Sequence, residues 1–193
     1  AFGVSILDPD APRAEQRFWK LDKALMGTPK CLAWIESLGV VAVGSTTGHI
    51  SLLDACTGVI QCFWKAHESA ITNLESNESR RVLVSAANDK QVYLWNVTTM
   101  PPRKVAQRAT TKENIHVLTH YNDGATISSS GNKLYSMLLP SAEQAAGNDH
   151  MAMKVRKVPW QNTKPERVTS MCMLPNHAIL VVGVEDGTLR FGF

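Results

Sequence analysis

The sequence has little of what marks several classes of protein. Charged residues make up only 19% of its 193 residues and the formal net charge is +3, so the composition favours a folded chain over a disordered tail and does not argue for an anionic partner. No apolar run approaches the roughly 20 residues that a helix needs to cross a bilayer. The first residues, AFGVSILDPDAPR, lack the basic and then apolar order of a signal peptide.

Cysteines are few, and their spacing gives no sign of a metal-binding or redox motif. The four are Cys31, Cys56, Cys62 and Cys172, and no two of them form a CxxC pair. Three lie within apolar stretches, where a free cysteine behaves as a small hydrophobic residue. We therefore expect a reducing, intracellular compartment. A Cys56–Cys62 or a Cys31–Cys172 disulfide is the alternative.

Catalytic and cofactor motifs are also missing. The sequence contains no GxGxxG, GxxxxGK[ST] or GxSxG string, and the GSTTG string at Gly44–Gly48 lies between two expected strands, with no helix N-terminus to receive a phosphate. His116 and His120 have the spacing of zinc ligands, but four residues along a strand cover about 13 Å, which is too far for one ion. We expect no enzyme activity, no cofactor and no metal.

What the chain does have is a repeated pattern. Leu83–Asn96 reads LVSAANDKQVYLWN, and similar strings stand at Val41–Asp54 and Leu180–Phe193. Each joins an apolar run, a polar turn with Gly or Asp, and a second run in which apolar and polar residues alternate as they do in a β-strand. An internal repeat of this kind decides the fold before any single residue does.

Each repeat predicts a unit of four strands, because one apolar segment precedes the pattern and another follows it. The preceding segments are Cys31–Ser37, Ile71–Asn77, His116–Asn122 and Thr169–Pro175, and the following ones are Val59–Trp64, Lys104–Arg108 and His150–Val158. About 42 residues separate Thr47 in the first turn from Asp89 in the second, which matches the roughly 40–45 residues of a β-propeller blade. No helix is predicted; a single turn within Ala11–Lys23 is the alternative.

The second unit resembles a repeat of the WD-repeat β-propeller family. In that family a His before the first strand, a Ser or Thr in the second strand, an Asp in the turn and a Trp in the third strand form a buried hydrogen-bonded set. The matching residues here are His67, Ser85, Asp89 and Trp95. The resemblance implies that Asp89 accepts from His67, that His67 bonds Ser85, and that Ser85 accepts from the indole N–H of Trp95, which needs such a partner when buried. The set is structural in the family.

The other units match this motif less well. The first has Thr47 and Leu53 where Asp and Trp would stand, and the third has Asn132 in a shortened turn. The fourth keeps Asp186 but has Gly192 at the Trp position. The resemblance therefore covers nearly the whole chain as a pattern and one unit as a full motif.

We predict an all-β fold, a β-propeller built of four-stranded antiparallel blades, with about four blades present of an expected seven. Residues 1–23 would end a preceding blade, residues 28–65, 67–108 and 111–159 would form three blades, with a loop insertion at 140–149, and residues 164–193 would begin an incomplete one. An open arc of blades exposes sheet edges, so we expect a longer chain or a partner protein to complete the ring. A small ring of four blades is the alternative.

The predicted function is a non-catalytic protein–protein interaction scaffold, a rigid platform within a larger protein or multiprotein assembly. Its partners would be other proteins that contact several loops at once. The candidate contact residues lie in the turns between the second and third strands, with one tryptophan on an outer strand that could instead pack between blades: Thr46, Thr47, Asn88, Lys90, Lys133, Glu185 and Trp64. The loops near Lys65, Glu68 and Lys112 are further candidates.

Two alternatives stay open. One is a structural component of a large assembly such as a ciliary axoneme or a vesicle coat. The other is a nucleic-acid-binding or phosphoinositide-binding propeller, for which the basic clusters are Arg80-Arg81, Arg103-Lys104 and Lys154–Lys157. A charged outer strand that discourages edge pairing explains Lys154–Lys157 more simply, and no aromatic residues interleave with it as nucleic-acid binding would favour. Arg80-Arg81 lacks the flanking aromatic or glycine residues of a phosphoinositide motif. The expected location is cytoplasmic, with cytoskeletal, ciliary and nuclear sites as alternatives.

Overall fold

The protein is built almost entirely of β-strands. The computed structural model describes residues 3–6, 17–20, 26–108, 115–122, 125–130, 133–140, 151–159, 166–174 and 179–192. Within these residues helical structure is limited to Met26 and the 3-10 turn η2 at Glu36–Leu38, and no helix there is long and apolar enough to cross a membrane. The segment in which a helical turn was the alternative is described only at Arg17–Lys20, which is a strand.

The described strands form five sheets. The pair β1 (Gly3–Ile6) and β2 (Arg17–Lys20) comes first. Blade 1 contains β3 (Pro29–Ile35), β4 (Val40–Ser45), β5 (His49–Asp54) and β6 (Ile60–Lys65). Blade 2 contains β7 (Ile71–Asn77), β8 (Val82–Ala87), β9 (Val92–Asn96) and β10 (Arg103–Arg108). Blade 3 contains β11 (Ile115–Asn122), β12 (Ala125–Ser130), β13 (Lys133–Leu138) and β15 (Val155–Lys157). Blade 4 contains β16 (Val168–Leu174), β17 (Ile179–Val184) and β18 (Leu189–Gly192).

Strands within a blade are antiparallel neighbours in chain order, because the polar turn of each repeat is short enough only for a hairpin. The third turn residue has a left-handed backbone in blades 1, 2 and 4, with φ of 80° at Gly48, 65° at Lys90 and 82° at Gly187. Glycine adopts this conformation without steric cost, whereas a residue with a Cβ does not. Sheets of four antiparallel strands confirm the predicted all-β class.

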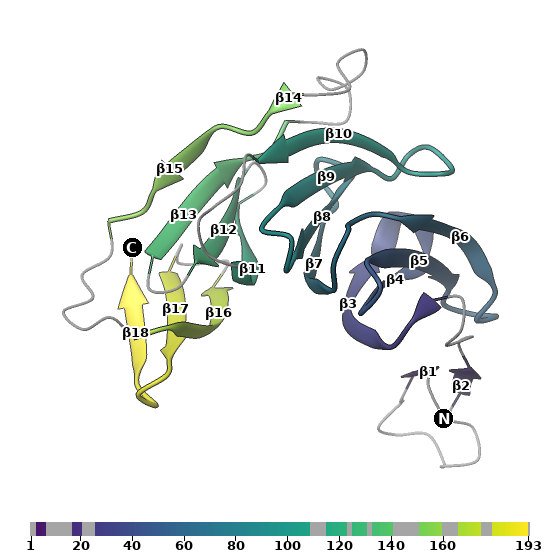
Figure 1. Cartoon of the computed structure of the whole chain (residues 1–193), viewed down its shortest axis with the longest axis horizontal. Helices are drawn as coiled ribbons and strands as arrows, with labels where there is room; N and C mark the ends of the chain where they lie inside the picture. Colours follow the sequence, from purple (N-terminus) through teal and green to yellow (C-terminus); the bar gives the residue numbers. More distant parts are fainter. Residues whose placement is uncertain are drawn as a thin grey trace.

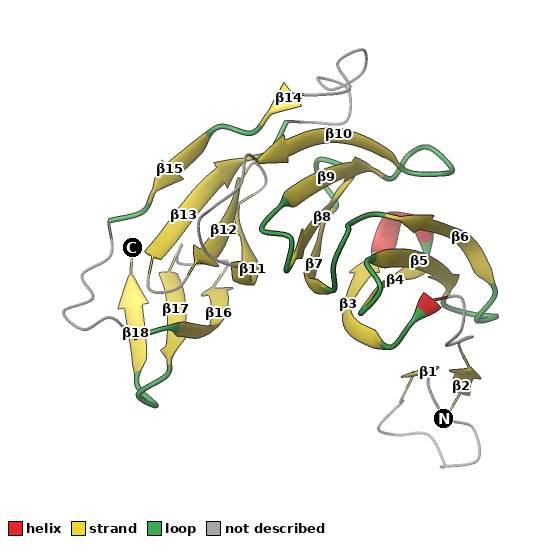
Figure 2. Ribbon diagram, viewed as in Figure 1, coloured by secondary structure: helices red, strands yellow, loops and turns green. Residues whose placement is uncertain are grey.

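The blades succeed one another along an open arc, with the N-terminus near one end and the C-terminus near the other (Figure 1). The first strands of adjacent blades contact each other, β3 with β7, β7 with β11 and β11 with β16. The colouring by secondary structure shows strands facing strands from blade to blade, joined by short loops (Figure 2). The hydrophobic core is accordingly divided into clusters that lie between successive sheets.

The last strand predicted for blade 3, residues 150–158, is split between two blades. Its first part, β14 (Met151–Ala152), pairs in parallel with β10 of blade 2. Its second part, β15, pairs antiparallel with β13 of blade 3. The sequence pattern shows where a strand forms but not which sheet it joins, because edge pairing depends on which neighbouring backbone lies within reach. This segment therefore holds blades 2 and 3 together at their outer edge (Figure 1).

Candidate functional site

The four motif residues of blade 2 form one connected hydrogen-bonded set. Nδ1 of His67 lies 2.9 Å from Oδ2 of Asp89, and its Nε2 lies 2.7 Å from Oγ of Ser85. The indole Nε1 of Trp95 donates to the same Ser85 hydroxyl at 2.8 Å. Asp89 also accepts from the backbone N–H groups of Glu68 and Gln91. The set joins the loop before β7 to strands β8 and β9 and to the turn between them.

The chain of donors and acceptors fixes the protonation of His67. Nδ1 donates to the Asp89 carboxylate, so Nε2 accepts from the Ser85 hydroxyl, and Ser85 in turn accepts from Trp95. Burial lowers the pKa of His67 and outweighs the opposite effect of Asp89. A neutral imidazole in this tautomer satisfies every member. Asp89, His67 and Ser85 are linked in the order of a catalytic triad, but Ser85 is 0% exposed and its hydroxyl also accepts from Trp95, so the set stabilises the blade.

Aromatic rings continue this set toward blade 1 and toward the outer strand. Tyr93 stacks on His67 with ring centroids 4.5 Å apart, and Nζ of Lys104 lies 4.5 Å above the Tyr93 ring. Trp64 of β6 meets Trp95 edge-on at 5.5 Å. The sequence left two roles open for Trp64, contact with a partner and packing between blades. In the structure it packs between blades 1 and 2.

Blade 1 replaces the missing motif with hydroxyl groups. Oγ1 of Thr47, at the Asp position, donates to the carbonyl of Met26 at 3.0 Å and accepts from Ser45 and from Nδ1 of His49. Oγ of Ser45 in turn accepts from the backbone N–H of His49 at 3.1 Å. The turn is thus tied to the segment before β3, as the turn of blade 2 is tied to the segment before β7.

Blade 4 uses ion pairs at the same place. The guanidinium of Arg190 lies 3.3 Å from the Glu166 carboxylate and 3.4 Å from that of Asp186. Hydrogen bonds from the side chain and backbone of Thr188 are the main cause that lowers the pKa of Asp186 to about 2, and the charge of Arg190 is the smallest of the causes. Three chemically different sets therefore fix the corresponding turn in blades 1, 2 and 4.

Two contacts join blade 1 to blade 2, and neither was predicted. The carbonyl of Gly48 accepts from the backbone N–H groups of Ala66 and His67, each at 2.9 Å. The carboxylate of Glu78 accepts from the backbone N–H groups of Glu36 at 2.9 Å and Ser37 at 3.1 Å. Partial burial acts to raise the pKa of Glu78, but hydrogen bonds from Ser37, Ser76 and Glu36 outweigh it and lower the pKa. No local sequence signal marks either contact, since the partners of Glu78 lie 42 and 41 residues away.

The predicted contact residues of the turns are exposed. Thr46 and Thr47 lie between β4 and β5, Asn88 and Lys90 between β8 and β9, and Glu185 between β17 and β18. Lys133 is exposed at the start of β13. These positions correspond in the repeat, so the turns occupy equivalent places in successive blades. Lys65 and Glu68 are also exposed, whereas Lys112 and Asn132 lie outside the described residues.

Blade 1 has one sheet face against blade 2 and one on the opposite side. On the opposite face, the apolar side chains of the first strand, β3, are exposed to solvent. Leu32 and Trp34 of β3 pair with Val43 and Val41 of β4. Among the described residues, Val4, Trp19 and Met26 cover the β4–β5 part of this face. Leu32 is 53% exposed, whereas Leu74, which has the same register in blade 2, is 5% exposed beneath blade 1.

The face of blade 4 that lies opposite blade 3 also exposes apolar side chains to solvent. Phe191 of β18 is 63% exposed, while Leu94, at the same place in the repeat of blade 2, is 0% exposed beneath blade 3. Leu189 and Cys172 are exposed on this face too. Each end of the arc thus presents to solvent the apolar positions that blade-to-blade packing buries elsewhere in the chain.

The described residues offer no second kind of site. No group of three or more His, Cys, Asp or Glu residues in that part of the chain could hold a metal ion. His116 and His120 lie on β11, a strand as predicted, and their side chains are outside the described part. All four cysteines are free, so neither alternative disulfide forms.

Comparison with known proteins agrees with this architecture. The WD domain, G-beta repeat family matches residues 58–96 and 157–191. The probable inactive serine/threonine-protein kinase lvsG of Dictyostelium discoideum is 31% identical over 153 residues, which cover 78% of this chain and 7% of that protein. WD repeat-containing protein 81 of Danio rerio is 28% identical over 190 residues, which cover 97% of this chain and 9% of that protein.

Among solved structures, the β-propeller domain of Cps50 (Swd1) from Myceliophteria thermophila superposes with a TM-score of 0.66 at 14% sequence identity. The likeness covers 84% of this chain and 53% of that one, and at this identity it concerns the fold alone. The chain spans less than a tenth of the length of the two curated relatives.

Proposed function

Because the chain belongs to the WD-repeat β-propeller family, whose members generally serve as scaffolds for protein interactions, we propose that it is a non-catalytic scaffold whose two end faces each take up a further β-sheet. The observation that carries this proposal is the pair of bare faces. Leu32 and Phe191 are more than half exposed although their counterparts Leu74 and Leu94 are buried by a neighbouring blade.

Physical chemistry favours a β-sheet as the occupant of both faces. Burying apolar surface contributes roughly 25 cal/mol per Å², and large exposed apolar patches are typical of interaction sites. At the three interfaces between blades 1 to 4, the apolar face of one sheet is buried against the next sheet. A sheet from elsewhere in a longer polypeptide or from a separate protein would complete each end in the same manner.

The exposed turns supply a second way of contacting partners. Thr46, Thr47, Asn88, Lys90, Lys133 and Glu185 are exposed at equivalent places of successive blades. Side-chain contacts hold these turns in place: hydroxyl groups in blade 1, the histidine set in blade 2 and ion pairs in blade 4. A partner that contacts several of them would lose little conformational entropy in the scaffold, which is the advantage of a preorganised surface.

The proposal extends to an intracellular assembly. The cysteines are free, and Cys31 and Cys62 pack against the core between blades 1 and 2, which supports a reducing compartment. A scaffold with two apolar end faces suits membership of a multiprotein complex. The basic clusters favour no separate nucleic-acid or lipid function, because the described basic residues of the outer strands have a simpler role at sheet edges.

Photo-crosslinking tests the end faces. Benzoylphenylalanine would replace Phe191 or Leu32 in the protein expressed in its own cells, and the control position is Leu138, which is 44% exposed on β13. We expect crosslinks from both end positions to a peptide with the alternating pattern of a blade strand, from the same polypeptide or from another protein, and none from Leu138. Solvent labelling of all three positions without a crosslink would refute the proposal.

A further inference from the structure

The outer edges of the sheets differ in how they are protected from pairing with another chain. An outer strand exposes a row of unpaired backbone N–H and C=O groups, and proteins usually blunt it with charge, shortness or a cover. Strand β2 has two basic residues among four, and β15 has two among three. Strand β10 has three among six and is also covered in part by β14.

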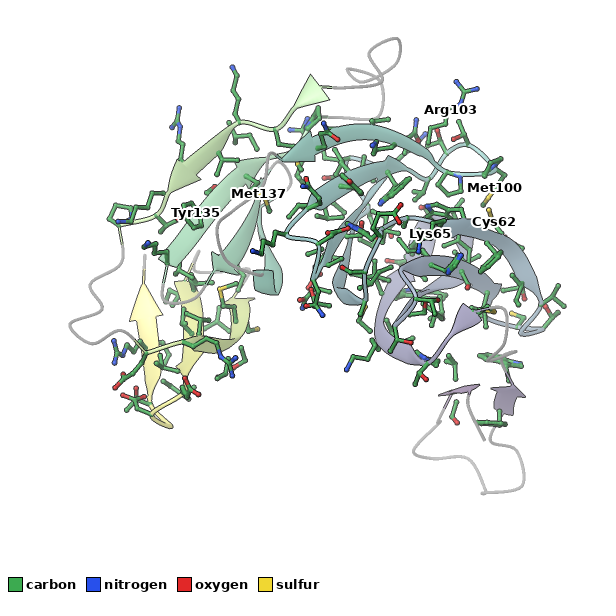
Figure 3. All side chains as sticks on the ribbon, in the orientation of Figure 1. Cys62, Lys65, Met100, Arg103, Tyr135 and Met137 are labelled. Carbon is green, nitrogen blue, oxygen red and sulfur yellow. The ribbon has the colours of Figure 1, made fainter. Side chains whose placement is uncertain are left out.

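Strand β6 lacks all of these protections. Its six residues, IQCFWK, contain a single charge, Lys65 at the last position, and no described strand pairs with its outer side. Ile60 is 42% exposed and Phe63 is 41% exposed, and both share the face of Leu53 and Ser51 on β5. Figure 3 labels Cys62 and Lys65 on this strand, at the outer side of the arc.

Blade 2 shows how such an edge is filled. Met151–Ala152 pairs in parallel with Ala106 and Gln107 of β10, and the backbone N–H of Met153 donates to the carbonyl of Gln107 at 3.1 Å. Met153 itself is buried in the cluster between blades 2 and 3. The covering segment, Met151-Ala152-Met153, carries no charge. An uncharged extended segment at an outer edge thus gains both backbone hydrogen bonds and apolar burial at the seam between blades.

We propose that the outer edge of β6 binds an extended, uncharged segment of a partner polypeptide by strand addition, with apolar residues at alternate positions. Backbone hydrogen bonds to β6 supply the general affinity, as in other cases of strand addition. A side chain of the added strand that stands opposite Ile60 or Phe63 lies on the same face as that residue, because directly opposed residues of adjacent strands share one face. Ile60 and Phe63 lie on the same face of blade 1 as Leu32 and Trp34. Strand addition uses the backbone groups of the β6 edge and not that face, so the inference does not require a sheet to bind there.

The chemistry of β6 decides the kind of partner. A polyanion such as a nucleic acid or a charged lipid surface is held mainly by lysine and arginine, and β6 offers one lysine, whose Nζ already donates to the carbonyl of Thr47 at 2.9 Å. An apolar peptide instead matches the flanks of this edge. Phe63 is also held in place for such a contact, since it stacks on His49 with ring centroids 4.8 Å apart.

The test uses the 193-residue chain and a fluorescein-labelled peptide of about ten residues in which valine alternates with threonine. The peptide's binding is followed by fluorescence anisotropy, and the protection of the β6 amides by hydrogen exchange of the unmodified protein. A second peptide carries proline at its central positions and cannot donate to a strand ladder. The edge variant is Ile60→Lys with Phe63→Lys, and the matched control is Leu138→Lys, at a similarly exposed leucine of blade 3.

We expect saturable binding of the valine–threonine peptide, slower exchange at residues 60–65, and a Kd at least about tenfold higher in the edge variant and for the proline peptide, with no change in Leu138→Lys. No binding at about 1 mM peptide, or protection confined to other strands, overturns the proposal whether or not the variants fold. A concentration-dependent dimer that the edge variant abolishes also overturns it, because the occupant would then be a second copy of the chain.

Discussion

Gly48 of blade 1 packs directly against the backbone of His67 in blade 2. The carbonyl of Gly48 accepts from the His67 N–H at 2.9 Å, and a Cβ built on Gly48 would collide with the carbonyl oxygen of His67 and with that of Ser69. The turn of one blade therefore fits against the loop that carries the buried histidine of the next. The rigidity of the hydrogen-bonded set in blade 2 therefore depends in part on blade 1.

The first prediction follows from this contact. Gly48→Ala should lower the free energy of unfolding by about 3 kcal/mol, because the new methyl meets fixed backbone atoms and φ of 80° adds strain of about 1 kcal/mol. Gly187→Ala is the matched control, since Gly187 has φ of 82° and no described atom within 4 Å of the added Cβ. Urea denaturation of both variants measures the difference, and equal losses would show that backbone strain alone is at work.

The hydrogen-bonded set could be predicted from the sequence because its four members lie within one repeat. His67, Ser85, Asp89 and Trp95 have the order and residue types of the family motif, and each needs the partner that the next one supplies. The replacement set of blade 1 could not be predicted. A threonine at the Asp position signals a lost motif, and only the fold shows that its hydroxyl reaches the carbonyl of Met26.

Contacts between blades could not be predicted from the sequence, for a different reason. Alternation of apolar and polar residues specifies a strand and its two faces, but it carries no information on which backbone lies next to an outer edge. Residues 150–158 read as one strand and yet divide between β10 and β13. The Glu78 carboxylate looks like an ordinary turn residue, although it binds the backbone of Glu36 and Ser37 in another blade.

The second prediction concerns the turn between β8 and β9, whose left-handed position is occupied by lysine. Lys90 has φ of 65° at the position that Gly48 and Gly187 occupy in the other turns. Lys90→Gly should leave stability unchanged or raise it by up to about 1 kcal/mol, because the strain it relieves offsets the entropy that glycine adds to the unfolded chain. The same substitution at Lys30, an exposed residue in strand β3, should instead destabilise. A loss at Lys90 as large as that at Lys30 would contradict the strain argument.

The third prediction concerns the hydroxyl at the centre of the set. Ser85→Ala leaves both Nε2 of His67 and the indole N–H of Trp95 without their hydrogen-bond partner in a buried site, so unfolding should become easier by about 1–3 kcal/mol. Thr169→Ala removes a hydroxyl from an exposed position on β16 and should cost much less. Chemical denaturation followed by tryptophan fluorescence measures both, and an unaffected Ser85→Ala protein would remove the structural role of the set.

The fourth prediction is a pH dependence centred on Glu75 of β7. Burial raises the pKa of Glu75 from 4.5 to about 7, so between these values the folded carboxyl keeps its proton while the unfolded chain loses it. The folded state then binds more protons than the unfolded state, and stability falls as the pH rises until the folded group has also ionised.

Glu75→Gln removes the ionisable group and with it this loss. Relative to the unsubstituted protein, the variant should gain about 2–3 kcal/mol of stability between pH 4.5 and pH 8, since one pKa unit corresponds to about 1.4 kcal/mol. Glu75→Leu is a second variant without an ionisable group. Any change in hydrogen bonding shifts its free energy of unfolding by a similar amount at every pH, so the dependence of stability on pH should match that of Glu75→Gln. Parallel pH profiles for all three proteins would mean that the Glu75 carboxyl ionises alike in the folded and unfolded states, so that burial on the inner strand of blade 2 imposes no penalty on its charge.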